Sequence, residues 1–302
     1  MAPSTEIGQT DLRAEVVDKV IKGFATASYK FKQAVSVVST GAWQNTYYRE
    51  ASGALTGSGN NAVKGIPRGA NFPQAVVEWE KLTSWVEKYG LEDNIMWEDI
   101  LSDNVDVKSR TLYRIAEGVA SAVDAEIWSV LSEDRAGSAT TATVDIQEVA
   151  LEVASEKGKY WDVASAAIID DIMNAKQRIG QFNYPTSNLM MFISERDHRS
   201  IVKYLADSGA QFPSIGEEMA RNGRVGKIAG VNLVVSNNVT ASYALVVVPK
   251  ICGTWKASVP LKTEVTVDPF KSVRVRAVEM GVLQLTDPKA VCVISGTQSR
   301  FA

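Results

Sequence analysis

Residue types that commonly do chemistry are scarce in this sequence, and few are spaced to act together. The only histidine, His198, stands in the run Glu195 to His198, so any catalytic triad or dyad would have to be built on it. That run falls on a predicted helix, where a solvated surface position is the simpler interpretation of His198. With one histidine and two distant cysteines, Cys252 and Cys292, a zinc or iron site of the usual nitrogen and sulfur type is not expected.

A glycine-rich segment offers the one match to a cofactor motif. Gly57 to Ala62 has the spacing of a dinucleotide-binding loop, which works only between a buried strand and a helix. Gly65 and Pro67 would break such a helix at once, so the segment is better interpreted as the tip of a projecting loop. No Gly-Lys-Ser or Gly-Lys-Thr sequence is present to form a phosphate-binding loop, and we expect no catalytic, cofactor-binding or metal-binding residues.

Adjacent acidic residues raise a different enzymatic hypothesis. Asp170-Asp171 and Glu217-Glu218 could do acid-base work only if the fold brought two carboxylates together across a cleft, because neighbours on a helix do not face each other. Surface charge is the simpler interpretation. A hydrolase of mixed α/β type, with an unknown substrate, stays open as an alternative function.

Bulk composition describes a folded globular protein. The chain has 302 residues, of which 45% are hydrophobic and 22% are charged. Its formal charge of -3 does not indicate a protein that binds nucleic acid or anionic membranes through its overall field. The cysteines are expected to be buried small hydrophobes in a reducing compartment. No secretion signal or membrane-spanning run is evident.

The N-terminal third predicts an arm followed by a long two-stranded loop. Apolar residues recur at helical spacing from Asp11 to Ala34, which predicts an amphipathic arm that docks on its own domain or on a neighbour. Between 41 and 90 the pattern changes: alternating residues from Val77 to Tyr89 indicate a strand, and the glycines from 53 to 69 indicate a flexible tip.

The remaining sequence predicts a long helix, alternating elements and then strands. Apolar residues step by three or four from Leu112 to Leu131, so a helix over 107–132 is expected, with Asp106 as its cap and another backbone packed close at Gly118. Further expected elements are helices near 163–179 and 195–206 and strands at 189–193, 231–235, 243–248, 263–267, 273–285 and 290–294.

This order of elements resembles the major capsid proteins of tailed double-stranded DNA viruses of bacteria or archaea, which have the Hong Kong 97 phage fold. The segments that carry the resemblance are 97–101 with Asp106 and the helix containing Asp124, then 189–193, 197–205, 226–231, 274–285 and 287–291. The resemblance implies a mixed α+β fold. Its parts would be an N-terminal arm (1–40), an extended β-hairpin loop (41–90), a peripheral domain (91–145 and 258–302) with a spine helix at 107–132, and an axial α/β domain (146–257).

The function implied by the resemblance is self-assembly. Copies would form pentamers and hexamers of an icosahedral virion shell, assembled in the host cytoplasm, that encloses DNA without reading its sequence. Portal and decoration proteins are expected partners. Because 1–40 is too short for a scaffolding extension, assembly would be guided by a separate scaffolding protein or would start from a chain already trimmed. No crosslink through Lys64 is predicted. An encapsulin-like compartment remains an alternative. Expected inter-subunit contact residues are Gly57, Gly59, Lys64, Arg68, Trp79 and Trp85.

Overall fold

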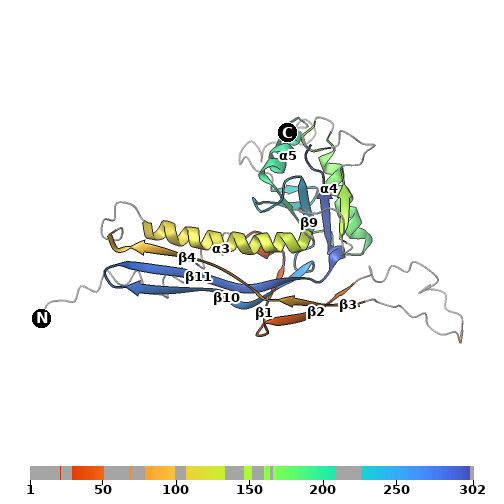
Figure 1. Ribbon diagram of the computed structural model, residues 1–302. Helices are drawn as coiled ribbons and strands as arrows, with labels where there is room; N and C mark the ends of the chain where they lie inside the picture. Colours follow the sequence, from red (N-terminus) through yellow and green to blue (C-terminus); the bar gives the residue numbers. More distant parts are fainter. Residues whose placement is uncertain are drawn as a thin grey trace.

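The computed structural model describes Ile21 and residues 29–50, 68–69, 79–98, 107–132, 146–151, 160–163, 166–207 and 226–299. Within these ranges the protein has the expected mixed α+β fold. A long helix, α3 (Val107–Ser132), lies along a four-stranded sheet, and a six-stranded sheet stands at the carboxyl end of that helix (Figure 1). Two shorter helices, α4 (Ile168–Gln181) and α5 (Glu195–Asp207), flank the six-stranded sheet.

The four-stranded sheet has the order β1-β10-β11-β4. Its strands are β1 (Ser36–Ser39), β10 (Gly253–Asp268), β11 (Ser272–Leu285) and β4 (Glu87–Met96). Residues of β11 alternate between a buried set that includes Val273 and Val275 and an exposed set that includes Arg274 and Arg276. This two-residue period places the apolar set against α3 and the arginines on the open face.

Helix α3 has the predicted bounds because its apolar stripe is continuous. Ile115, Val119, Val123, Ile127 and Leu131 are all buried, at steps of four residues. The prediction that another backbone packs close to Gly118 is wrong. A β-carbon there would lie 3.0 Å from Cδ2 of Leu91, which means that the near neighbour is a side chain of β4.

The six-stranded sheet has the order β5-β12-β9-β6-β8-β7. Its strands are β5 (Gln147–Ala150), β12 (Val291–Ser295), β9 (Tyr243–Val247), β6 (Leu189–Ile193), β8 (Val231–Val235) and β7 (Lys227–Ile228). The predicted division assigned 258–302 to the peripheral domain, whereas β12 lies inside this sheet and β10 crosses the 257–258 boundary. Residues 291–294 are buried on both faces, as a central strand requires.

The described part of the N-terminal arm packs on its own chain. A short 3-10 helix, η2 (Phe31–Gln33), replaces the end of the helix predicted up to Ala34, and β1 follows it and pairs in parallel with β10. Apart from Ile21 and the residues from Tyr29 onward, the predicted arm lies outside the described residues. A second 3-10 turn, η3 (Pro288–Ala290), leads into β12. Among the helices that the structure describes, none is both long and apolar enough to cross a bilayer.

Candidate assembly surface

A two-stranded hairpin extends past the end of the four-stranded sheet. It consists of β2 (Gln44–Glu50) and β3 (Trp79–Trp85), which pair antiparallel from Gln44 with Trp85 to Glu50 with Trp79 (Figure 1). The predicted loop 41–90 also included 87–90, which instead begin β4 and pair with β11. The sequence shows no break between β3 and β4, because the two-residue alternation of residue types that begins at Val77 continues through Tyr89.

One face of this hairpin is exposed along both strands. Because paired residues of antiparallel strands point to the same side, the register assigns each side chain to a face. Tyr48, Trp79 and Trp85 are 58%, 59% and 58% exposed. We call this the hairpin face, and its exposed residues are Gln44, Thr46, Tyr48, Trp79, Lys81, Thr83 and Trp85.

The opposite face of the hairpin is less exposed, although Glu80 lies open on it. Arg49 is only 8% exposed, and its Nη2 lies 2.5 Å from Oε2 of Glu80 on the facing strand. Burial raises the pKa of the Tyr47 hydroxyl on this side, and the nearby Arg49 guanidinium offsets part of that rise. One side of the hairpin therefore carries an ion pair between its two strands, and the other side is exposed and could contact another molecule.

The base of the hairpin is fastened to the four-stranded sheet. Val86, which separates β3 from β4, is 4% exposed, and its N–H donates to the carbonyl of Trp43 at 3.0 Å. Nε2 of Gln284 on β11 donates to Oγ of Ser84 at 2.9 Å. The hairpin is thus joined to the sheet by the chain at Val86, which continues into β4, and by the contact of Ser84 with β11.

The structure brings some predicted contact residues together and leaves others outside its description. Trp79 and Trp85 share the hairpin face, and Arg68 is exposed. Gly57, Gly59 and Lys64 lie outside the described residues. Sequence reasoning missed Tyr48, because only the pairing register of β2 with β3 shows that it lies on the same side as the two tryptophans.

The residues considered for chemistry are mostly engaged in structure. His198 is 8% exposed, so its interpretation as a solvated residue was wrong. Asp197 is fully buried and accepts hydrogen bonds from Oγ of Ser194 at 2.7 Å and Nε2 of Gln298 at 2.7 Å, while burial raises its pKa. Asp171, expected at the surface, is 6% exposed and accepts a hydrogen bond from Nε1 of Trp161 at 2.9 Å. These carboxylates fix loops to helices. The Glu217-Glu218 pair lies outside the described residues.

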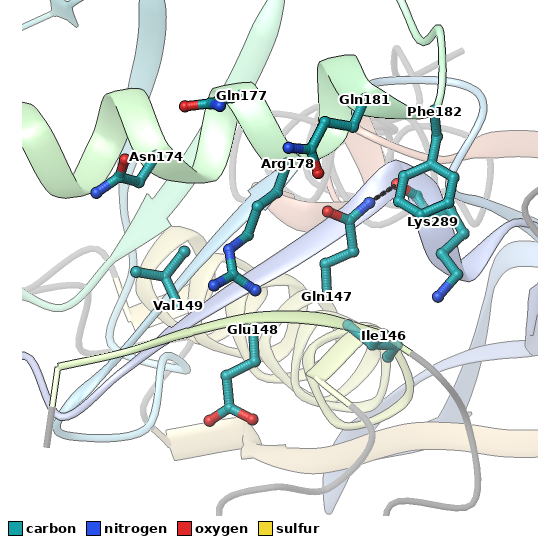
Figure 2. A pocket seen from close by; sticks show the side chains of 10 residues that line it. All are labelled: Ile146, Gln147, Glu148, Val149, Asn174, Gln177, Arg178, Gln181, Phe182 and Lys289. Carbon is teal, nitrogen blue, oxygen red and sulfur yellow. Dashed lines mark hydrogen bonds between the residues drawn. The ribbon is translucent and has the colours of Figure 1, made fainter. Parts of the chain in front are cut away.

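A groove of about 700 Å³ runs between α4 and the edge strand β5. Its walls carry amide side chains and two cations, Arg178 and Lys289. Among the described residues that line it, Glu148 is the one carboxylate, and it points away from α4 (Figure 2). Nε2 of Gln147 donates to the carbonyl of Lys289 at 2.7 Å. This set of side chains has no pair of facing carboxylates and no nucleophile beside a base, which the hydrolase hypothesis needs.

Over the described ranges, no three His, Cys, Asp or Glu side chains come together as a metal site would require. Cys252 and Cys292 are both fully buried, as expected from the sequence, and neither forms a disulfide among the described residues.

Comparison with known proteins points in one direction. The family described as phage capsid protein matches residues 85–294, which is more than half of the chain. No curated protein matches the sequence.

Solved structures share the fold at low sequence identity. The capsid of cyanophage P-SCSP1u has 14% identity and a TM-score of 0.64, over 90% of this chain and 89% of that chain. Mycobacterium phage Che8 gives 15% identity and a TM-score of 0.60, over 90% and 92%. A virus-like particle from Pyrococcus furiosus gives 11% identity and a TM-score of 0.58, over 93% and 98%.

Proposed function

This chain belongs to the phage capsid protein family and is a shell-forming structural subunit of the virion, and we propose that its copies associate into pentamers and hexamers through the hairpin face. The association is heterologous: a surface of one copy binds a different surface of the next, and the rotation closes into rings and then into an icosahedral shell. The observation that carries the proposal is the exposed, aromatic face of a hairpin that is joined to the four-stranded sheet.

The composition of the hairpin face supports a role in protein contacts. Aromatic residues are enriched in the cores of protein interfaces, and exposed apolar patches on a folded subunit mark interaction sites. Tyr48, Trp79 and Trp85 present large rings whose exposure would cost free energy if the protein worked alone. Packing against a neighbouring copy would remove them from water.

Enclosed double-stranded DNA is the proposed content of the shell. A subunit with a formal charge of -3 can be packed in many copies without strong self-repulsion and needs no sequence-specific contact with the DNA. The family match favours this content over the protein cargo of an encapsulin-like compartment. Scaffolding, portal and decoration proteins, with assembly in the host cytoplasm, are part of the same proposal on family grounds alone.

The proposal is tested with two matched double variants. Trp79→Thr with Trp85→Thr removes both indoles, and Trp79→Phe with Trp85→Phe keeps aromatic area at the same positions. We expect circular dichroism to show that the threonine pair stays folded. Sedimentation and electron microscopy should show a yield of shells at least tenfold lower than that of the wild type. The phenylalanine pair should assemble nearly as the wild type does.

Two results would overturn the proposal. If the threonine pair formed normal shells, the hairpin face would not be an assembly contact. Shells purified from infected cells that hold no nuclease-protected DNA would contradict the proposed content.

A further inference from the structure

Residues 29–35, called the strap below, join parts of the molecule that are distant in sequence. The ring of Phe31 stacks on Phe192 of β6 with centroids 4.2 Å apart, and it meets Trp128 of α3 edge-on at 5.7 Å. Phe31 is fully buried in this position. One strap residue therefore packs between the spine helix and the six-stranded sheet.

A buried carboxylate on α3 holds the backbone of the strap. Asp124 is 2% exposed. Its Oδ2 accepts the N–H of Lys30 at 2.6 Å, and its Oδ1 accepts the N–H of Lys32 at 3.3 Å. The two oxygens thus satisfy backbone donors at the start of η2, where no side chain of the strap itself provides a cap.

Further contacts fasten the strap to both sheets. Nζ of Lys32 lies 2.5 Å from Oε1 of Glu279 on β11, and the hydroxyl of Tyr29 donates to the same carboxylate. Nζ of Lys30 donates to the carbonyl of Val235, the last residue of β8, at 2.7 Å. The strap therefore crosses the junction between the four-stranded sheet, α3 and the six-stranded sheet.

We propose that the strap is a clamp that holds the six-stranded sheet against α3, and that this attachment becomes stronger at acidic pH through protonation of Asp124. A subunit that fits into both pentamers and hexamers must vary the angle between the six-stranded sheet and α3. The clamp would limit how far that angle can change. This role in a shell rests on the proposed function, whereas the pH response is a property of the single chain.

The direction of the pH response follows from proton linkage. Burial raises the pKa of Asp124 from 3.8 to about 6, and the strap N–H donors together with Lys32 offset only part of that rise. When the strap lifts, water reaches Asp124 and its pKa returns toward the ordinary value of about 4. The closed strap then holds more protons than the open one, so closing is favoured as pH falls from 7 to 4, by up to about a hundredfold.

Other charged groups face this site from each neighbouring element. Glu279 on β11 is paired with Lys32 and Tyr29. Burial raises the pKa of the Tyr29 hydroxyl above its ordinary value, so this group stays neutral throughout the range. The surrounding hollow is lined, besides Asp124, by Lys30, Tyr113, Glu117, Ser121, Ser236, Asn237 and Asn238.

The test is hydrogen–deuterium exchange of the full-length chain between pH 4.5 and 7.5, with each rate corrected for intrinsic pH dependence. In the wild type, the backbone N–H groups of 30–35 should gain protection as pH falls, by a factor of about ten or more, because exchange reports local opening. Asp124→Asn keeps the size of the side chain but cannot ionise, so its strap protection should be independent of pH. Protection of β9 serves as an internal reference.

Two further variants keep the test decisive. Asp197→Asn removes another buried carboxylate, one whose hydrogen bonds go to Ser194, Thr297 and Gln298 and not to the strap, and it should leave the pH slope of 30–35 unchanged. Phe31→Leu should lower strap protection at every pH while keeping the slope. A flat profile in the wild type, or an equal slope in Asp124→Asn, would overturn the proposal whether or not the chain assembles.

Discussion

Gly281 on β11 leaves the space that the indole of Trp255 on β10 occupies. A β-carbon on Gly281 would lie 2.5 Å from Cζ2 and 2.6 Å from Cε2 of that ring, and Trp255 is fully buried. The ring cannot move away without disturbing its other neighbours, which include Tyr89 and Lys32. The lack of a side chain at Gly281 is therefore what allows the Trp255 indole to lie against β11.

The first prediction concerns this contact. Gly281→Ala should lower the free energy of unfolding by about 1–3 kcal/mol, because overpacking a dense core forces strain on its neighbours. Urea denaturation followed by fluorescence measures the change. Gly41→Ala is the matched control, since nothing lies within 4 Å of a β-carbon at that position, and it should shift the midpoint little. Equal effects of the two substitutions would contradict the prediction.

The second prediction concerns the segment between the hairpin strands. Deleting Ser52 to Asn71 should leave a folded subunit, because β2 and β3 keep their register and their contacts at Val86 and Ser84. The same deletion should prevent stable shells. Circular dichroism and sedimentation velocity separate the two effects. An unfolded variant would show that the deleted segment belongs to the core.

The third prediction concerns the thiols. Burial raises the pKa of Cys252 to about 12, and Cys292 is fully buried as well, so neither should present a reactive thiolate at pH 8. Iodoacetamide should label neither residue in the native chain and both after denaturation in guanidinium, as read by mass spectrometry. Rapid labelling of native protein would mean that the β10 or β12 region opens far more often than its burial indicates.

The fourth prediction uses the raised pKa of Asp197. Because the folded pKa lies above the unfolded one, this carboxyl stabilises the fold most at low pH, and that stabilisation is lost as pH rises through the folded pKa. The wild type should therefore lose more stability between pH 4 and pH 7 than Asp197→Asn does. Urea midpoints at both pH values give the difference. Parallel pH profiles would argue against it.

Local patterns predicted the elements whose neighbours are close in sequence. The stripe on α3 and the strand at Leu189–Ile193 were found because a helix or strand shows its buried side as a period of 3.6 or 2. The two tryptophans of β3 were selected for the same reason. Their exposure could not be deduced, because the same alternation continues to Tyr89, which lies partly buried beside Trp255.

Long-range pairing decided what the sequence could not show. The insertion of β12 between β5 and β9 and the parallel pairing of β1 with β10 join distant segments and leave no local signature. Asp124, Asp171 and Asp197 have the helical context of surface acids. Each is buried because donors from distant segments satisfy it: Lys30 for Asp124, Trp161 for Asp171 and Thr297 for Asp197.

Val86 has a mechanical consequence. It is the single residue between β3 and β4, so a pull on the hairpin by a neighbouring subunit would travel along one strand into the ladder between β4 and β11. That ladder extends from Glu87 to Met96 and runs parallel to the pull, which loads its hydrogen bonds together in shear. A strand loaded this way resists more force than one peeled open bond by bond, so the contact surface and the four-stranded sheet share one continuous load path.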